Sequence, residues 1–168
     1  MIHLINLAIA AGVFIFTKTY AGLISFNSIE ISGTNLLEHI LIITFVIQWI
    51  AFIPAFALKT EKFYDVTGSL TYLSIFIYCL IATQSIEYLN FSNLIVAGAI
   101  MIWAVRLGSF LFMRISRDGK DERFNLIKTS FSRFFMTWTL QGMWVFICSS
   151  AALVAITSPM GVIVNNIL

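Results

Sequence analysis

The sequence predicts an all-α fold: a polytopic transmembrane helical bundle of about five spanning helices in a single domain, residues 1–168. First, 60% of the residues are hydrophobic and only 11% are charged, whereas a soluble domain carries about 25% charged residues. A core of this size cannot bury so much apolar surface, so lipid must solvate part of it. Second, five apolar segments approach the length of about 20 residues that crosses about 30 Å of hydrocarbon. Third, Lys and Arg are concentrated in alternate connecting segments.

The expected spans follow one another with short polar connections. The N-terminus has no basic segment and no small-x-small cleavage site, so we interpret the first span as a retained helix and not as a signal peptide. Lys18 interrupts this span, Pro54 lies near the end of the second, and Arg106 lies within the fourth. After Ser158 an apolar tail is too short to span, and it could begin a sixth helix whose remainder is missing. The five spans cover residues 4–26, 36–58, 70–86, 94–113 and 134–156.

Positive charge alternates between the connecting segments. Residues 27–35 and 87–93 contain no Lys or Arg, whereas residues 59–65 contain two. The segment 114–133 contains six of the chain's ten Lys and Arg residues. Basic residues in short loops mark the cytoplasmic side of a membrane. We therefore expect a basic cytoplasmic loop over 114–133, a cytoplasmic N-terminus and an integral membrane protein, with membrane lipids and not nucleic acid as its partners.

Arg106 is the most costly residue of the sequence, because an Arg at the centre of a spanning helix costs about 2.5–3.5 kcal/mol to insert on translocon scales. Arg114 follows eight residues later, about 12 Å along a helix. At 100° per residue the two share one broad face with Trp103, Phe110 and Arg117, and Gly108 leaves space beside the first Arg. Two guanidinium groups over an aromatic floor suit a phosphate-bearing ligand that arrives from the cytoplasm. The alternative is that Arg106 extends toward the cytoplasmic head groups while its stem packs on lipid.

The segment 117–124 mixes acidic and basic residues. A tether for lipid head groups would be mostly Lys and Arg, so the acids here indicate internal ion pairs. Such pairs would hold guanidinium groups in place for a ligand. The alternative is a salt-bridged hairpin without a ligand, in which Asp118-Gly119 forms a turn. The expected pairs join Asp118, Asp121 and Glu122 to Arg114, Arg117 and Arg123.

Tyr64, Asp65 and Gln141 are the candidates for polar contacts with a substrate. Tyr64 and Asp65 precede the third expected span, where they could lie at the cytoplasmic mouth of a cavity; Asp65 or Thr67 could instead cap the helix. Gln141 lies within the fifth span. A buried amide there either holds two helices together or orients a cofactor ring or a substrate carbonyl.

No metal site is expected. The histidines, His3 and His39, are far apart in the sequence, and the two cysteines do not form a CxxC pair, so neither a metal site nor a disulfide framework has support. Three polar residues are expected at the outer interface, namely Glu38, His39 and Glu87.

Together these residues resemble a known family. The segment Trp103-Ala-Val-Arg106-Leu107-Gly108, followed by Arg114 and by Gly119-Lys-Asp121-Glu122-Arg123-Phe124, resembles the W-x-x-R-L-G…R…G-x-D-x-R-[FY] signature of an uncharacterised bacterial branch of the steroid 5-alpha-reductase superfamily. Tyr64-Asp-Val-Thr-Gly68 resembles a segment after that branch's second helix, and Gln141-Gly142 resembles a Q-G pair in a later helix. The resemblance covers roughly residues 59–144.

The resemblance implies a membrane-embedded, NADPH-dependent reductase of a bacterial inner membrane that acts on a lipid enone or sterol-like substrate. Such a reductase is expected to have a polar cavity that opens to the cytoplasm and is lined by Arg106, Arg114 and Asp65. In such an enzyme Arg106, Arg114 and Arg123 match positions near the phosphates of the cofactor, and Asp121 matches a position that orients these arginines or touches the cofactor. Tyr64 and Asp65 match positions near the cavity. The resemblance assigns no catalytic proton donor.

One departure from the family leaves the activity open. The family's C-terminal S-R-H-P-N-Y-x-G-E block, which completes the cofactor site, is absent from this sequence. We therefore expect either the N-terminal part of a longer or split enzyme, completed by a partner subunit, or a degenerate relative, and weak binding of NADPH by the chain alone. One alternative is a non-catalytic membrane subunit or scaffold of a larger complex. A weaker one is a relative of the isoprenylcysteine-type methyltransferases, which use a sulfonium cofactor.

Overall fold

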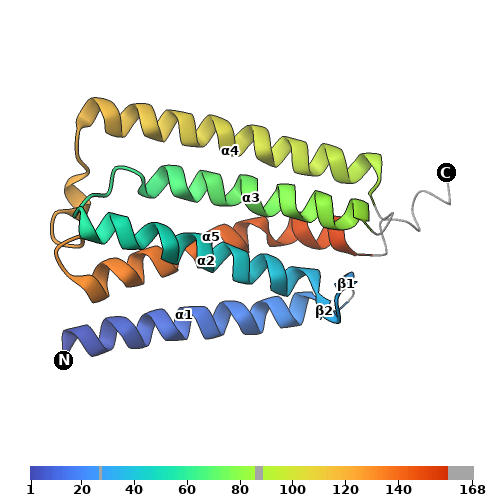
Figure 1. The fold of residues 1–168 in the computed structure, drawn as a ribbon, viewed down its shortest axis with the longest axis horizontal. Helices are drawn as coiled ribbons and strands as arrows, with labels where there is room; N and C mark the ends of the chain where they lie inside the picture. Colours follow the sequence, from blue (N-terminus) through green and yellow to red (C-terminus); the bar gives the residue numbers. More distant parts are fainter. Residues whose placement is uncertain (27, 86–88, 159–168) are drawn as a thin grey trace.

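Five long helices form the bundle in the computed structural model, which describes residues 1–26, 28–85 and 89–158 (Figure 1). Each is long and apolar enough to cross a membrane, so the predicted helical membrane fold is confirmed. The tail after Ser158 and the outer-interface residue Glu87, for which we stated expectations, lie outside the described residues. The helices are α1 (Ile2–Ile24), α2 (Leu36–Ala57), α3 (Tyr64–Ser85), α4 (Phe91–Asp118) and α5 (Phe131–Thr157).

The helices on the side of the basic loops extend beyond the expected spans. α3 begins at Tyr64 and not at residue 70, and α4 continues to Asp118 and not to residue 113. The expected loop 114–133 is therefore too long, because its first residues complete α4 and its last ones begin α5. Hydropathy marks the apolar part of a helix, whereas backbone hydrogen bonding continues until a capping residue ends it. At α4 that residue is Gly119, whose φ of 76° is left-handed and costs glycine little.

A short hairpin connects α1 to α2 at the opposite end of the bundle. Strands β1 (Glu30–Ile31) and β2 (Thr34–Asn35) pair antiparallel, with Glu30 opposite Asn35. The turn residues Ser32 and Gly33 both have positive φ, 54° and 81°, as a two-residue hairpin turn of type I′ requires. These strands were not predicted from the sequence.

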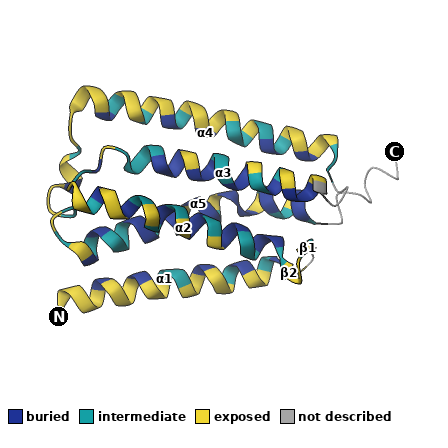
Figure 2. Cartoon of the chain, viewed as in Figure 1, coloured by how far each residue is buried: buried dark blue, intermediate teal, exposed yellow. Residues whose placement is uncertain are grey.

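α2, α3 and α5 form the centre of the bundle, and α1 and α4 lie at its two sides (Figure 1). α1 packs mainly on α5, and α4 packs mainly on α3 and only lightly on α5. Only 17% of the most apolar window of each outer helix is buried, and Figure 2 shows the long exposed stripes on both. In a membrane, lipid solvates these stripes.

α3 and α4 approach each other closely at Gly108. A Cβ atom at this position would lie 2.7 Å from the Cβ atom of Ser69 on α3. The expectation that Gly108 leaves space beside Arg106 is therefore wrong, because Ser69 occupies that side of the glycine. Small residues at such contacts let the backbones of transmembrane helices pack closely.

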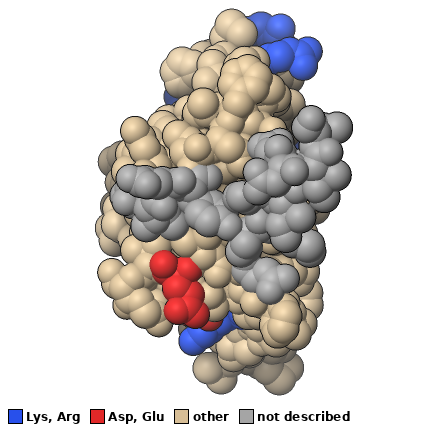
Figure 3. Space-filling model, turned by 90° about the vertical axis from the view of Figure 1, so that its right-hand side faces the viewer, with Lys and Arg blue, Asp and Glu red and all other residues tan. Residues whose placement is uncertain are grey.

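The two ends of the bundle differ in charge. The N-terminus lies at the same end as the loops at residues 58–63 and 119–130, and the hairpin lies at the other end (Figure 1). Figure 3, which faces the hairpin end, shows one acidic patch, a basic side chain directly beside it and further basic side chains at the upper margin. Glu30 of β1 and Glu38 in the first turn of α2 belong to this end. The common location of the N-terminus and the basic loops agrees with the topology that the alternating charges predict.

We predict that Gly108→Val lowers the free energy of unfolding by about 1–3 kcal/mol, because the new side chain overpacks the contact with Ser69. Gly98→Val is the matched control on the same helix, since a Cβ atom there meets no atom within 4 Å. Thermal unfolding of both variants in detergent micelles measures the difference. Equal destabilisation of the two variants would refute the close α3–α4 contact.

Candidate functional site

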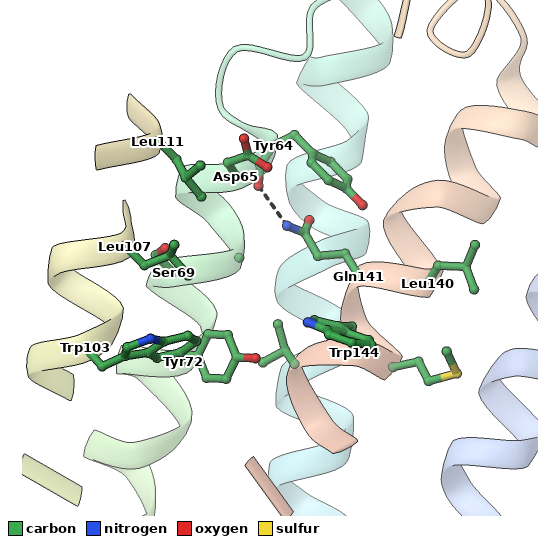
Figure 4. A pocket seen from close by; sticks show the side chains of 13 residues that line it. Tyr64, Asp65, Ser69, Tyr72, Trp103, Leu107, Leu111, Leu140, Gln141 and Trp144 are labelled. Carbon is green, nitrogen blue, oxygen red and sulfur yellow. Dashed lines mark hydrogen bonds between the residues drawn. The ribbon is translucent and has the colours of Figure 1, made fainter. Parts of the chain in front are cut away.

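A hollow of about 470 Å³ lies between α3, α4 and α5 (Figure 4). α3 forms its floor, and the two other helices form its walls. Trp103 on α4 and Trp144 on α5 border the hollow and are 45% and 65% exposed, so it opens on the side of the bundle and not only at its end. Its lining is mostly apolar, and comprises Tyr64, Asp65, Gly68, Ser69, Tyr72, Trp103, Leu107, Leu111, Leu140, Gln141, Met143, Trp144 and Val145. We call it the lateral hollow.

Tyr64 joins three elements at the loop end of the lateral hollow. Its hydroxyl donates a hydrogen bond of 3.1 Å to the carbonyl oxygen of Thr137 on α5. Its ring packs against Trp138 and against Phe124 of the loop, both with centroids 5.0 Å away. Tyr64 therefore holds the start of α3 against α5 and against the basic loop, and its predicted place beside a cavity agrees with this geometry.

The amide of Gln141 projects toward α3 from the facing wall. Its Nε2 donates a hydrogen bond of 3.1 Å to the carbonyl oxygen of Tyr64 (Figure 4, dashed line). A carbonyl only accepts, so this bond fixes which side of the amide faces α3. The other side, Oε1, is buried and has no partner among the described residues.

Gly68 makes room for this amide, since a Cβ atom there would lie 2.5 Å from Nε2 of Gln141. The two roles considered for Gln141 therefore do not exclude each other. Its nitrogen holds two helices together, and its oxygen is a buried acceptor with no partner among the described residues. A buried acceptor left unpaired is costly, so a donor group that reached it would stabilise it.

Asp65 and Arg114 form an ion pair between α3 and α4. Nη2 of Arg114 lies 3.1 Å from Oδ2 of Asp65. Neither predicted cap is found on α3: Asp65 lies in its first turn, and the hydroxyl of Thr67 donates to the carbonyl oxygen of Phe63. Asp65 lines the lateral hollow, and Arg114 lines a second, charged hollow of about 280 Å³. The ion pair thus forms part of the wall between an apolar and a charged compartment.

The charged hollow lies in the loop after α4, beside the 3-10 helix η1 (Glu122–Phe124). Asp121 accepts hydrogen bonds from the guanidinium and the backbone N–H of Arg123. These bonds from Arg123 lower the pKa of Asp121, and the same carboxylate raises the pKa of Arg123. The predicted pairing of loop acids with loop arginines is confirmed for Asp121 with Arg123 and for Asp118 with Arg117.

The cations of the charged hollow are paired. Arg114 pairs with Asp65, Arg123 with Asp121, and Lys120 lies 4.0 Å from Glu122. An incoming phosphate must therefore share these cations with carboxylates. Each guanidinium has five N–H donors, so donors remain on Arg114, which gives one hydrogen bond within the described chain.

A buried ion pair anchors this loop. It was not predicted from the sequence. Oε2 of Glu61, in the α2–α3 connection, accepts a hydrogen bond of 2.7 Å from Nζ of Lys128, and its Oε1 accepts one of 3.0 Å from the backbone N–H of Asp121. Burial alone raises the pKa of Glu61, but the bonds from Lys128 and Asp121 outweigh it, and the pKa lies below 4.5. The one sequence signal was an acid between Lys59 and Lys62, which identifies no partner.

Arg106 lies apart from this group. It is exposed on α4 and lines a third hollow of about 250 Å³ with Trp103, Leu107 and Phe110. Within the described part of the chain, Arg106 and Arg114 line different hollows and not the expected shared cavity with Asp65, because eight residues rotate the helix by about 80° and advance it by about 12 Å. The predicted common face of Trp103, Arg106 and Phe110 agrees with this lining. The role of Arg106 in binding a cofactor stays a prediction.

Comparison with known proteins identifies a family for most of the chain. Residues 51–166 match the model of the family described as "Protein of unknown function (DUF1295)". No curated protein and no solved structure matched the chain. The matched region contains the residues that line the lateral and charged hollows.

We predict that Glu61→Gln destabilises the protein by about 1–2 kcal/mol at neutral pH, because a charged hydrogen-bond acceptor is lost. Since the folded pKa of Glu61 lies below its ordinary 4.5, its contribution is present above that value and is lost as pH falls through the folded pKa. Thermal unfolding in micelles at neutral pH and at about pH 4 should therefore show the difference between variant and parent shrinking in acid.

Glu122→Gln is the matched control, because Glu122 is exposed and its pair with Lys120 is long; it should change stability little at either pH. A Glu61→Gln chain with the parent's stability at neutral pH would contradict the anchoring role of the pair.

Proposed function

This chain belongs to the DUF1295 family, which is associated with steroid 5-alpha-reductase-like proteins, and from this premise we propose that it is a membrane-embedded, lipid-binding protein of the reductase type. In this proposal the lateral hollow holds a lipid-like substrate, and the charged hollow holds the phosphates of NADPH. The protein lies in a bacterial inner membrane with its basic loops in the cytoplasm.

The lateral hollow is the observation that carries the proposal. Its volume of about 470 Å³ falls in the range of about 300–1,000 Å³ typical of small-molecule sites. It is lined by apolar and aromatic side chains with a few polar groups at one end, as such sites usually are. Because it opens sideways between Trp103 and Trp144, a hydrophobic molecule would reach it from the bilayer without crossing water.

The polar side chains lie at one end of the lateral hollow, where the oxygen-bearing end of a bound lipid would lie. Oε1 of Gln141 would accept from a donor, and Asp65, held by Arg114, would keep the nearby surface polar. Tyr64 and Gly68 position the amide. These residues would orient the molecule along α3, with its apolar part toward Trp103 and Trp144.

The charged hollow fits the phosphates of NADPH by the chemistry of its donors. Arg114 and Arg123 would donate the N–H groups that their carboxylates leave free, and Asp121 would hold Arg123 in place. When bound, NADPH would supply a hydride to an activated C=C bond. The Asp65–Arg114 pair would then separate the phosphates from the lipid. A partner subunit that supplies the family's C-terminal block would complete this site.

A non-catalytic membrane subunit or scaffold is the second candidate. The full pairing of the loop cations favours it, since Arg114, Lys120 and Arg123 each already have a carboxylate, and Arg117 has Asp118. A relative of the isoprenylcysteine-type methyltransferases is a weaker third, because a sulfonium cofactor brings a positive charge to a hollow with acidic residues.

We predict that a photoactivatable sterol labels the lining of the lateral hollow in the full chain reconstituted in nanodiscs. Leu107→Trp should reduce this labelling severalfold, because Leu107 lines the hollow and the larger side chain fills it. Ile102→Trp is the matched control on the outer face of α4, since Ile102 is 73% exposed and outside the lining. Labelled peptides are mapped by mass spectrometry. Equal labelling in both variants would refute the hollow as the lipid site.

We predict weak, saturable binding of NADPH to the reconstituted chain, reduced at least tenfold by Arg123→Gln. A charge-assisted hydrogen bond contributes about 1.5–3 kcal/mol, and about 1.4 kcal/mol is a factor of ten in affinity. Arg117→Gln is the matched control, because Arg117 has an equivalent acidic neighbour but lies outside the charged hollow. Fluorescence titration of NADPH measures the affinities.

A parallel titration with S-adenosylmethionine separates the alternatives. Binding of that cofactor in place of NADPH would favour the methyltransferase. Sterol labelling without binding of either cofactor would favour the scaffold.

A further inference from the structure

We propose that Arg106 and the aromatic face around it bind the acidic head group of a bilayer phospholipid, and that this contact gives the side opening of the lateral hollow a preference for anionic lipid. The inference rests on the proposed lipid-binding role of that hollow, and adds the class of lipid.

An unpaired Arg106 costs free energy at its depth in the membrane. The residue lies near the middle of α4, about 18 Å along the helix from Asp118 and about 22 Å from Phe91. It is exposed, and no hydrogen bond or ion pair to it is found within residues 1–26, 28–85 and 89–158. A charged side chain in this region of a bilayer is expensive unless an opposite charge or water meets it. Something outside the described chain must therefore supply an anion.

The described residues of a second copy of this chain offer no such anion. The carboxylates in the described part of the chain lie at the two ends of the bundle, in the hairpin and the start of α2 or in the loops beside α3 and α4. None of them lies at the depth of Arg106. A second copy packed alongside would bring apolar side chains to the guanidinium.

A transmembrane helix of another protein is a poor candidate for the source of the anion. The side chains that line the third hollow with Arg106 are large, and two of them, Trp103 and Phe110, are 45% and 58% exposed. Helices pack closely in membranes where small residues let the backbones approach, as Gly108 does on the side of α4 that faces α3. Protruding rings would hold a helix away, whereas a flexible lipid chain can pass between them.

The side chain of Arg106 must also be able to reach a lipid phosphate. Arg114, about 12 Å along α4 from Arg106, pairs with Asp65 near the loop end and marks the approach to the head groups. A long Arg side chain extends toward that interface, and local thinning of the bilayer closes the remaining gap, which is how charged residues within membranes are ordinarily accommodated. Because Asp65 is already paired with Arg114, a lipid phosphate is the nearest anion that something outside the described chain can supply.

The contact of Arg106 with a lipid phosphate would lie beside the lateral hollow. Trp103 and Leu107 line both the third hollow and the lateral hollow, so the two are neighbours across these side chains. A phospholipid held by its phosphate at Arg106 would lay an acyl chain against Trp103, at the side opening. Figure 4 shows Trp103 and Leu107 on the α4 wall of that opening.

The experiment uses the full chain in phosphatidylcholine nanodiscs that contain a trace of photoactivatable lipid. Phosphatidylglycerol and phosphatidylcholine carrying the same diazirine-labelled acyl chains are compared in separate samples. The ratio of labelling by the two lipids is measured on peptides of α4 and α5 that line the lateral hollow. The variants are Arg106→Gln, which removes the charge, Arg106→Lys, which retains it, and Arg117→Gln, the matched control on the same helix.

We expect phosphatidylglycerol to label these peptides about fivefold more than phosphatidylcholine in the parent chain, since one basic residue near anionic lipid contributes an effect of that order. The ratio should fall to about one in Arg106→Gln and persist in Arg106→Lys and Arg117→Gln. Arg106→Gln removes an unpaired charge from an exposed face, so it should insert and fold.

Other results would overturn the inference in different ways. A ratio near one in the parent chain, with the sterol still labelling the hollow, would refute the anionic preference and leave the proposed function standing. A fivefold ratio that persists in Arg106→Gln would assign the preference to the basic loop. If neither phospholipid nor the sterol labels the hollow, both the inference and the proposed function fail.

Discussion

Hydrocarbon offers no hydrogen-bond partner, and this constraint organises the whole bundle. Every backbone polar group within a membrane must be satisfied inside the protein, which favours uninterrupted helices. Hydroxyl side chains of the helices obey the same rule by donating to the carbonyl oxygen four residues earlier, as Thr44, Thr71 and Ser149 do. Against this background an unsatisfied buried group is conspicuous. Oε1 of Gln141 is such a group, and Gln141 is one of the residues that line the lateral hollow.

At the loop end of the bundle the opposite condition holds. Charged residues are plentiful there, and the fold pairs them locally, between neighbours such as Asp121 and Arg123, or across elements, as in Glu61 with Lys128. The cross-element pairs are the more informative. Glu61 accepts from both Lys128 and the backbone of Asp121, so the α2–α3 connection fixes the shape of the loop after α4. The geometry of the charged hollow therefore depends on a residue outside it.

The sequence predicted those parts of the fold that depend on composition along one helix. Five spans and the common end of the N-terminus and basic loops follow from apolar length and charge, and Gly119 ended α4 where the Asp-Gly turn signal lay. Contacts between residues far apart in the sequence could not be predicted. Arg114 pairs with Asp65 and not with a loop acid, and Gly108 serves the contact with Ser69. Both outcomes depend on how α3 lies against α4, which no local pattern records.

The sequence predicted which residues belong to the candidate site but not how they are arranged in space. Tyr64, Asp65 and Gln141 do meet at one hollow, because each lies on the side of its helix that faces the gap between α4 and α5. Arg106 was grouped with Arg114 on a broad helical face, but about 80° of rotation is enough to place one beside lipid and the other against α3. Arg114 shares its charge with Asp65 in the wall between the lateral and charged hollows. Arg106 is exposed on α4 and has no charge partner among the described residues. In the proposed function Arg114 would separate the lipid from the charged hollow, whereas Arg106 would meet a lipid head group at the side opening.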